Sequence, residues 1–286
     1  MGITQLRATF LLQLFTNLLN LLLTFLFVLY FQWEVRGVAL ATLIAQVLST
    51  FLGVLLVLKY NMFNLRAISF RQLFDLQAFY KIMKVNSDLM IRTVCLLIMT
   101  NLFVATSSSF GVVIFAANAI LFQLHYFIGN FVDGIASATS VLAGQTVGRK
   151  DPNLLTLTIR LSWIWTSVMI VVLTIIYLVC NKPILSLFTN APEVLQQVYH
   201  YSFWLLLYPL SYGYNSVFYG FFTGIMQSAI IRVSALIALL CFLLGLWLVV
   251  PAWQSHGLWI AFLLFNVGRT FYLIFHLLRV KPALVI

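Results

Sequence analysis

Long apolar runs, separated by short polar segments, occupy most of the chain. They lie at residues 9-31, 36-58, 89-106, 112-146, 157-180, 196-222, 230-251 and 257-279. Each run is close to or above the roughly 20 helical residues needed to cross a bilayer. We therefore predict an all-α fold, a polytopic membrane helix bundle with eight transmembrane helices. An even number of spans places both termini on the same side of the membrane.

The longest connection between two apolar runs extends from residue 59 to residue 88. It contains LRAISFRQLFDLQAFYKIMK, in which Leu, Ile and Phe mix with Arg and Lys at near-helical spacing. This pattern is typical of an amphipathic helix that lies in the membrane interface. We predict three parts: residues 1-58 with two helices, a cytoplasmic interfacial linker at 59-88, and residues 89-286 with six helices.

The composition supports a membrane protein and excludes a soluble domain. Hydrophobic residues make up 63% of the chain and charged residues 8%, with a mean hydropathy of +1.06. The net charge of +10 would suit a nucleic acid, but its placement indicates topology instead. Of the 16 Lys and Arg residues, only Arg36 and Lys182 fall in loops on the side opposite residue 1, and Arg269 lies inside the last span. We therefore expect cytoplasmic termini in the inner (plasma) membrane, contact with membrane lipid, and no nucleic acid partner.

Two segments of the chain resemble each other. MGITQ at residues 1 to 5 is similar to TGIMQ at residues 223 to 227. Gly2 precedes Gly37 by nearly the same distance along the chain as Gly224 precedes Gly257. We interpret spans one and two as repeats of spans seven and eight, because many transporters are built from internal repeats.

No sequence pattern of an enzyme is present. The chain lacks GxxxxGK[ST], HExxH and GxSxG, and its cysteines and histidines are isolated rather than spaced as metal ligands. We predict no enzymatic activity, no catalytic residue, no metal site and no cofactor. Transport driven by ATP would need a nucleotide-binding domain, so an ion gradient is the energy source that we expect.

Polar side chains line one face of the first span. Gln13, Asn17, Asn20 and Thr24 are spaced by three or four residues and therefore share a helical face. Such a stripe either forms hydrogen bonds to a neighbouring helix or lines a polar cavity. Asn17, Asn20 and Thr24 are candidate cavity residues on the second interpretation.

The fourth span carries an acid in the middle of the membrane. Asp133 lies there, and because an intramembrane acid is costly it is our candidate for an ion-coupling residue. The alternative is a structural carboxylate paired with a basic or amide group. Ala136, Ser140, Gly144 and Gly148 follow at intervals of four, which predicts a closely packed neighbouring helix.

The sixth span combines a proline with many aromatic residues. Pro209 is expected to kink it, and Tyr212 and Tyr219 are candidate substrate-facing aromatics for organic cations, with ordinary packing as the alternative. Two arginines complete the set of candidates. Arg92 lies near a span end, whereas Arg269 lies deeper in the last span and requires a partner.

Four phrases resemble a known family. VNSDLMIRT (85-93), FAANAILFQL (115-124), VDGIASATSVLAGQTVGRKD (132-151) and HGLWIA (256-261) are similar to the second half of multidrug and toxic compound extrusion (MATE) transporters, in the DinF-like branch. Spans one and two look like that family's fifth and sixth helices. The resemblance implies a two-lobed, twelve-helix antiporter that exports small amphipathic or cationic organic compounds against protons or sodium ions. This chain would hold helices five to twelve: a remnant of the N-terminal lobe and the C-terminal lobe.

The resemblance also bears on single residues. Asp133 and Arg92 occupy matching positions of the family pattern, and Asn20 matches a cavity residue of the N-terminal lobe. Thr24 stands where the family typically has Asp in the fifth helix, and Tyr219 stands where it usually has Asp in the tenth. The acid implicated in proton coupling in the family's first helix has no counterpart in this chain.

Two other functions stay open at this point. A flippase for lipid-linked oligosaccharides, on a related fold, would need basic residues along its cavity, and Arg92 and Arg269 are the two available. The other alternative is a non-transporting remnant or interaction subunit, which would act with a partner chain or a missing N-terminal segment.

Overall fold

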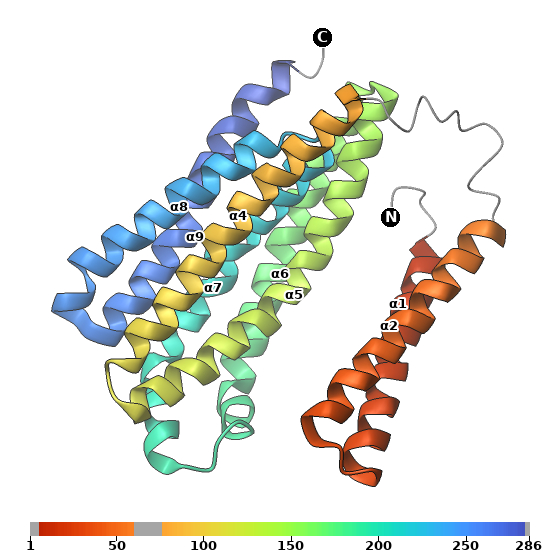
Figure 1. Ribbon diagram of the computed structural model, residues 1–286. Coiled ribbons are helices and arrows are strands. Elements are labelled where there is room, and N and C mark those ends of the chain that lie inside the picture. Colours follow the sequence, from red (N-terminus) through yellow and green to blue (C-terminus); the bar gives the residue numbers. More distant parts are fainter. Residues whose placement is uncertain (1–5, 60–75, 284–286) are drawn as a thin grey trace. The chain divides into compact units, whose positions relative to one another are not determined.

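The computed structural model describes residues 6–59 and 76–283, which are helical apart from the short turns between helices. It contains eight α-helices and one π-helical turn within the described residues, and no strand there. The elements, shown in Figure 1, are α1 (Leu6–Phe25), η1 (Leu26–Tyr30), α2 (Glu34–Lys59), α4 (Leu76–Ser108), α5 (Val112–Arg149), α6 (Pro152–Ser186), α7 (Pro192–Gly224), α8 (Ser228–Leu248) and α9 (Val250–Ala283). The predicted all-α membrane bundle is confirmed.

Helix α7 differs from the other long helices in its polarity. Across the described ranges, seven helices are long and apolar enough to cross a membrane, and α7 is not one of them. Polar residues lie both in its first turns, PEVLQQVYHYS, and in its central segment SYGYNS. The packing explains this composition, because α7 contacts α5, α6, α8 and α9. Many of its side chains therefore face other helices rather than lipid.

The chain divides into two compact units, residues 1–79 and residues 80–286. Of the linker predicted at 59-88, residues 60–75 lie outside the described residues. Residues 76–88 belong to α4, which continues without a break to Ser108. An ion pair joins α4 to α8: Asp88, 1% exposed, accepts hydrogen bonds from the half-buried Arg232 at 2.6 Å and from Ser228 at 2.7 Å, both on α8.

The first unit contains a helical hairpin of α1 and α2. Two polar contacts join its helices: Asn20 Nδ2 donates to Thr42 Oγ1 at 3.0 Å, and the hydroxyls of Thr16 and Ser49 lie 2.5 Å apart. Hydrogen bonds of this kind replace the hydrophobic driving force that lipid does not supply. The side chain of Asn20 therefore serves the contact between helices.

The turns of two hairpins share a local geometry, as the proposed repeat requires. Glu34 (φ 43°) lies three residues before Gly37, and Gln254 (φ 46°) lies three residues before Gly257. A Cβ on Gly37 would lie 3.0 Å from Cβ of Phe27, and a Cβ on Gly257 would lie 2.7 Å from the carbonyl oxygen of Val249. In each hairpin a glycine therefore lets the second helix begin directly against the end of the first.

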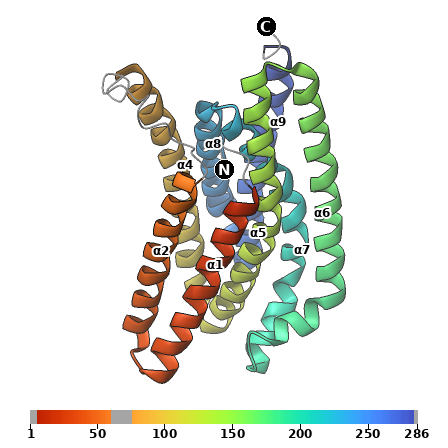
Figure 2. The same cartoon turned by 90° about the vertical axis from the view of Figure 1, so that its right-hand side faces the viewer.

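Local sequence determines the turn between α5 and α6. Lys150 (φ 52°) ends α5 in the left-handed conformation. Asp151 then caps α6, because its carboxylate accepts hydrogen bonds from the backbone N–H groups of Asn153 and Leu154. Pro152 occupies the first helical position, where no N–H donor is needed. In Figure 1 and Figure 2 this turn lies at the same end of the second unit as the end of α9.

Helices α5 and α7 approach each other through small residues, as the spacing of four predicts. A Cβ on Gly220 would lie 2.2 Å from the carbonyl oxygen of Ala136, and a Cβ on Gly224 would lie 2.2 Å from that of Ser140. Gly144 faces Gly224 in the same contact. Gly148, in contrast, has no atom near the position of its missing Cβ. The close contact therefore involves three of the four predicted residues.

At the opposite end of this unit, aromatic rings and one amide join three helices. Phe103 of α4 packs against Phe122 of α5 and Trp259 of α9. Asn118 of α5 donates to the hydroxyls of Ser107 and Ser255 at 2.9 and 3.0 Å, and its oxygen accepts from Nε1 of Trp259 at 2.9 Å. Almost all hydrogen-bonding groups of this buried amide thus have partners. These hydrogen bonds specify how the three helices are rotated relative to one another.

Candidate functional site

The carboxylate of Asp133 is bound by two hydroxyl groups from a neighbouring helix. Tyr212 Oη donates to its Oδ1 at 2.8 Å and Ser216 Oγ donates to the same oxygen at 2.5 Å. Tyr212 and Ser216 are one turn apart on α7, so both reach toward α5. Asp133 itself is half-buried. The acid in the fourth span therefore has polar partners but no ion pair in the described part of the chain.

Two arginines converge on one tyrosine ring. The guanidinium carbon of Arg92 lies 4.0 Å from the centroid of the Tyr219 ring, and that of Arg269 lies 5.3 Å from the same centroid. Arg92 comes from α4, Tyr219 from α7 and Arg269 from α9. Cation-π contact of this kind stabilises each arginine, but the ring is then already in contact with two cations. The surroundings of the Tyr219 ring are therefore positively charged, and its role as a substrate-facing aromatic residue stays a prediction.

Several polar atoms in this region have no partner among the described residues. Nε and Nη2 of Arg269, Nε of Arg92 and both side-chain atoms of Asn215 are enclosed without a hydrogen bond. Arg269 is 3% exposed and Asn215 is fully buried. An unpaired buried polar group is costly, and an unpaired buried charge more so. This concentration of unsatisfied groups distinguishes the region from ordinary helix packing.

Five of the predicted site residues thus lie together in the second unit. Arg269 interacts electrostatically with Arg92, Asp133, Tyr212 and Tyr219, which connects the carboxylate to the two-arginine group. We name these five residues and Asn215 the arginine–aspartate cluster. The three candidates of the first span lie in the first unit: Asn20 bonds to Thr42, Asn17 is exposed and Thr24 is half-buried.

Two polar residues of this unit are not among the predicted site residues. Asn215 is a buried amide in the middle of an aromatic helix, and its polarity alone would indicate a candidate. Asp88, at the end of the predicted linker, is buried and paired with Arg232. No local signal connects Asp88 with Arg232, because the two residues are far apart in sequence and meet only through helix packing.

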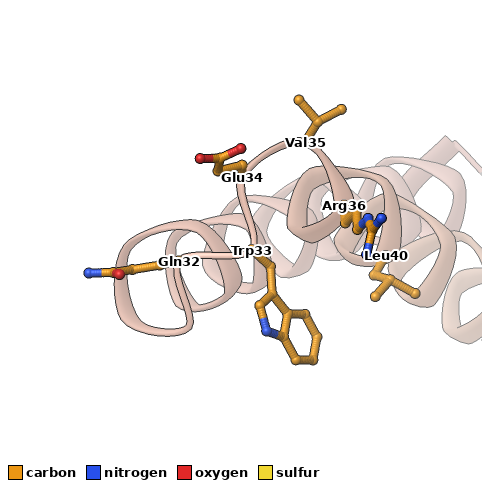
Figure 3. Close-up of a pocket in the computed structure, with 6 residues that line it drawn as sticks. All are labelled: Gln32, Trp33, Glu34, Val35, Arg36 and Leu40. Atoms are coloured by element: carbon orange, nitrogen blue, oxygen red, sulfur yellow. The ribbon is translucent and has the colours of Figure 1, made fainter.

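Two surface pockets lie in the first unit and contain no residue of the arginine–aspartate cluster. Figure 3 shows one of them at the turn between α1 and α2, where the side chains point in different directions and do not converge on a common centre. Its lining residues are Gln32, Trp33, Glu34, Val35, Arg36 and Leu40. A second depression follows α2 from Leu43 to Val54. Neither contains a predicted site residue.

Comparison with known proteins assigns this architecture to transporters. The MatE family model matches residues 89–250. The chain is 28% identical to DNA damage-inducible protein F of Escherichia coli over 271 residues, covering 94% of this chain and 58% of that protein. It therefore spans less than two thirds of the length of this relative.

Solved structures show the same fold at low sequence identity. The Vibrio cholerae MATE transporter VcmN in its bent form superposes with a TM-score of 0.80 at 19% identity, covering 97% of this chain and 63% of VcmN. A MOP superfamily transporter from Pyrococcus furiosus gives a TM-score of 0.76 at 16% identity, with 96% and 62% coverage. Both similarities extend along nearly all of this chain.

Proposed function

This chain belongs to the MatE family of membrane transporters, and from that premise we propose that it takes part in secondary active efflux of amphipathic compounds. The proposed mechanism is alternating access, with protons or sodium ions moving inward as substrate moves outward. The transporting form would include helices beyond these 286 residues, because the relatives are longer.

The observation that carries this proposal is the environment of Asp133. A carboxylate that couples ion movement has to exist within the membrane both with a bound proton or sodium ion and without one. Both forms need hydrogen-bonding partners. The hydroxyls of Tyr212 and Ser216 donate to the ionised carboxylate. Both hydroxyls can also accept a hydrogen bond, so they suit the protonated acid as well. This adaptability favours an exchange site over a fixed structural carboxylate.

For localisation, we propose the inner membrane with both termini in the cytoplasm. Loops 31-36, 107-111, 181-195 and 252-256 would then face outward, and the 59-88 segment inward.

In a variant without Cys95, Cys180 and Cys241, a single cysteine at Ser109→Cys or Asn190→Cys should react with an impermeant maleimide on intact cells. Lys150→Cys should react only after the membrane is permeabilised. Labelling of Lys150→Cys but not of Asn190→Cys in intact cells would reverse the orientation.

Transport is tested in liposomes with two preparations. One contains the 286-residue chain, and the other contains the same chain extended at its N-terminus by the first four helices of DNA damage-inducible protein F. With an imposed proton or sodium gradient, the extended chain is expected to move an amphipathic dye, tested with one anionic and one cationic dye, whereas the 286-residue chain should give only passive leak. A cavity between two lobes cannot close when one lobe consists of two helices. Equal leak from both preparations would reject the transport proposal and favour an interaction subunit.

One observation favours the flippase as a second candidate. Arg92 and Arg269, the two basic residues that a pyrophosphate-binding cavity would use, lie against the same ring. A flippase moves its substrate without an imposed ion gradient when the substrate is supplied on one side. Movement of a lipid-linked oligosaccharide that is independent of any gradient would support this function over drug efflux.

A further inference from the structure

We infer that the arginine–aspartate cluster binds a negatively charged head group of an amphiphile, so that this lobe selects anionic rather than cationic compounds. This proposal rests on the proposed transport function and adds the charge of the compound that is bound. It is carried by the juxtaposition of two arginines and one aspartate, with enclosed and unpartnered nitrogen atoms on both arginines.

The balance of charge within the cluster is positive. Arg92 and Arg269 contribute two positive charges and Asp133 contributes one negative charge. Across the described ranges the single ion pair is that of Arg232 with Asp88, so neither cluster arginine is directly neutralised. Charged groups inside a membrane normally face each other in pairs or line a path for a substrate. An excess of one positive charge is the complement of one anionic group.

The hydrogen-bonding capacity of the cluster points to the same ligand. The enclosed nitrogens of Arg92 and Arg269 are donors without an acceptor. Arginine is the preferred residue for carboxylate and phosphate groups because its planar donors match their oxygens. In contrast, Oδ1 of Asp133 already accepts two hydrogen bonds. Donors are therefore in surplus, and an anion supplies acceptors.

Exposure indicates how such a group reaches the cluster. Arg92, Asp133, Tyr212 and Tyr219 are half-buried, whereas Arg269 and Asn215 are buried. Of the two arginines, Arg92 is therefore the more accessible to a ligand, and Arg269 is the more enclosed.

Binding to the 286-residue chain, measured by titration calorimetry in an uncharged detergent, tests the inference. The probes are octyl phosphate and octyltrimethylammonium, which have equal chain lengths and opposite charges. Octyl phosphate should bind with saturation and the cation should not at the same concentrations. Arg92→Gln and Arg269→Gln should each weaken octyl phosphate binding by about tenfold, the effect of losing one charged hydrogen bond. Arg279→Gln is the matched control, because Arg279 also lies 4.0 Å over an aromatic ring, that of Phe275, outside the cluster.

The variant Asp133→Asn distinguishes a site for anions from a site for cations, because the two predict opposite changes in affinity. Removal of its negative charge should tighten octyl phosphate binding by about tenfold, whereas a site for cations would lose affinity. The inference is overturned if Asp133→Asn weakens octyl phosphate binding, if the two probes bind equally, or if neither cluster arginine alters binding. These binding results do not depend on a gradient, so a failure of transport would leave them intact.

The same assay separates two sources of the anionic group. Dihexanoyl phosphatidic acid presents a lipid head group, and octyl phosphate presents a free amphiphile. Tighter binding of the former assigns the cluster to membrane lipid, and tighter binding of the latter assigns it to a transported compound. Either order supports an anion site, provided that Arg92→Gln weakens both probes.

Discussion

Gly220→Ala is expected to lower the stability of the second unit by about 3 kcal/mol or more, at the upper end of overpacking effects. The added methyl group would lie 2.2 Å from the carbonyl oxygen of Ala136 and 2.8 Å from its carbonyl carbon. Both are backbone atoms of α5, so no rotation of a side chain relieves the overlap. The two helices have to separate, and their contact along the small-residue interface is lost.

Thermal unfolding in detergent measures this effect with a dye that reacts with exposed thiols. Cys95 is buried and unpaired, so its reaction reports unfolding of α4 and its neighbours. Gly134→Ala and Gly148→Ala on α5 are matched controls, because nothing lies within 4 Å of either added methyl group. Each control should leave the midpoint unchanged or raise it slightly, since Ala favours a helix over Gly by about 1 kcal/mol. An unchanged midpoint for Gly220→Ala would contradict the close packing of α5 and α7.

Asp133→Asn is expected to abolish gradient-driven efflux by the extended chain, although the variant is still expressed and still binds substrate, more tightly where the substrate is an anionic amphiphile. Asn has nearly the same shape as Asp, and its carbonyl oxygen still accepts the hydrogen bonds of Tyr212 and Ser216. It does not take up or release a proton and carries no charge for a sodium ion. Structural contacts are thereby retained and ion exchange is removed.

The assay pairs substrate binding in detergent with transport in liposomes over a range of pH. Glu193→Gln is the control, since Glu193 is also an acid but lies in the exposed first turn of α7. It should behave as the unmodified chain in both measurements. Undiminished transport by Asp133→Asn with the same dependence on pH would assign coupling to residues outside this cluster.

Sequence patterns predicted the helices well because hydropathy is a local property. The apolar runs correspond to the described helices, including the long run that becomes α5, and the spacing of small residues indicated the contact that Gly144 makes. What the pattern did not reveal is how the helices are rotated against each other. Arg92 and Arg269 come from α4 and α9, and their meeting at Tyr219 depends on the rotation of three helices at once.

The same limit applies to Tyr219 and to Asp88. The Tyr219 ring, a candidate surface for organic cations, lies near two arginines of the same chain. Asp88, at the end of the predicted interfacial segment, is buried and paired with Arg232 of α8. These partners are distant in sequence, so no local pattern indicates them.

The contact of Gly220 and Gly224 with α5 also determines where this lobe can change shape. Backbone packed against backbone resists rotation and sliding, so we expect the parts of α5 and α7 that meet there to move together. Pro209, one turn before Tyr212, cannot donate a backbone hydrogen bond within α7, and we expect the helix to bend there. Tyr212 and Ser216, which bind Asp133, lie between these two places on α7. A change of charge on Asp133 is therefore expected to act at the boundary between a fixed part and a bendable part of α7.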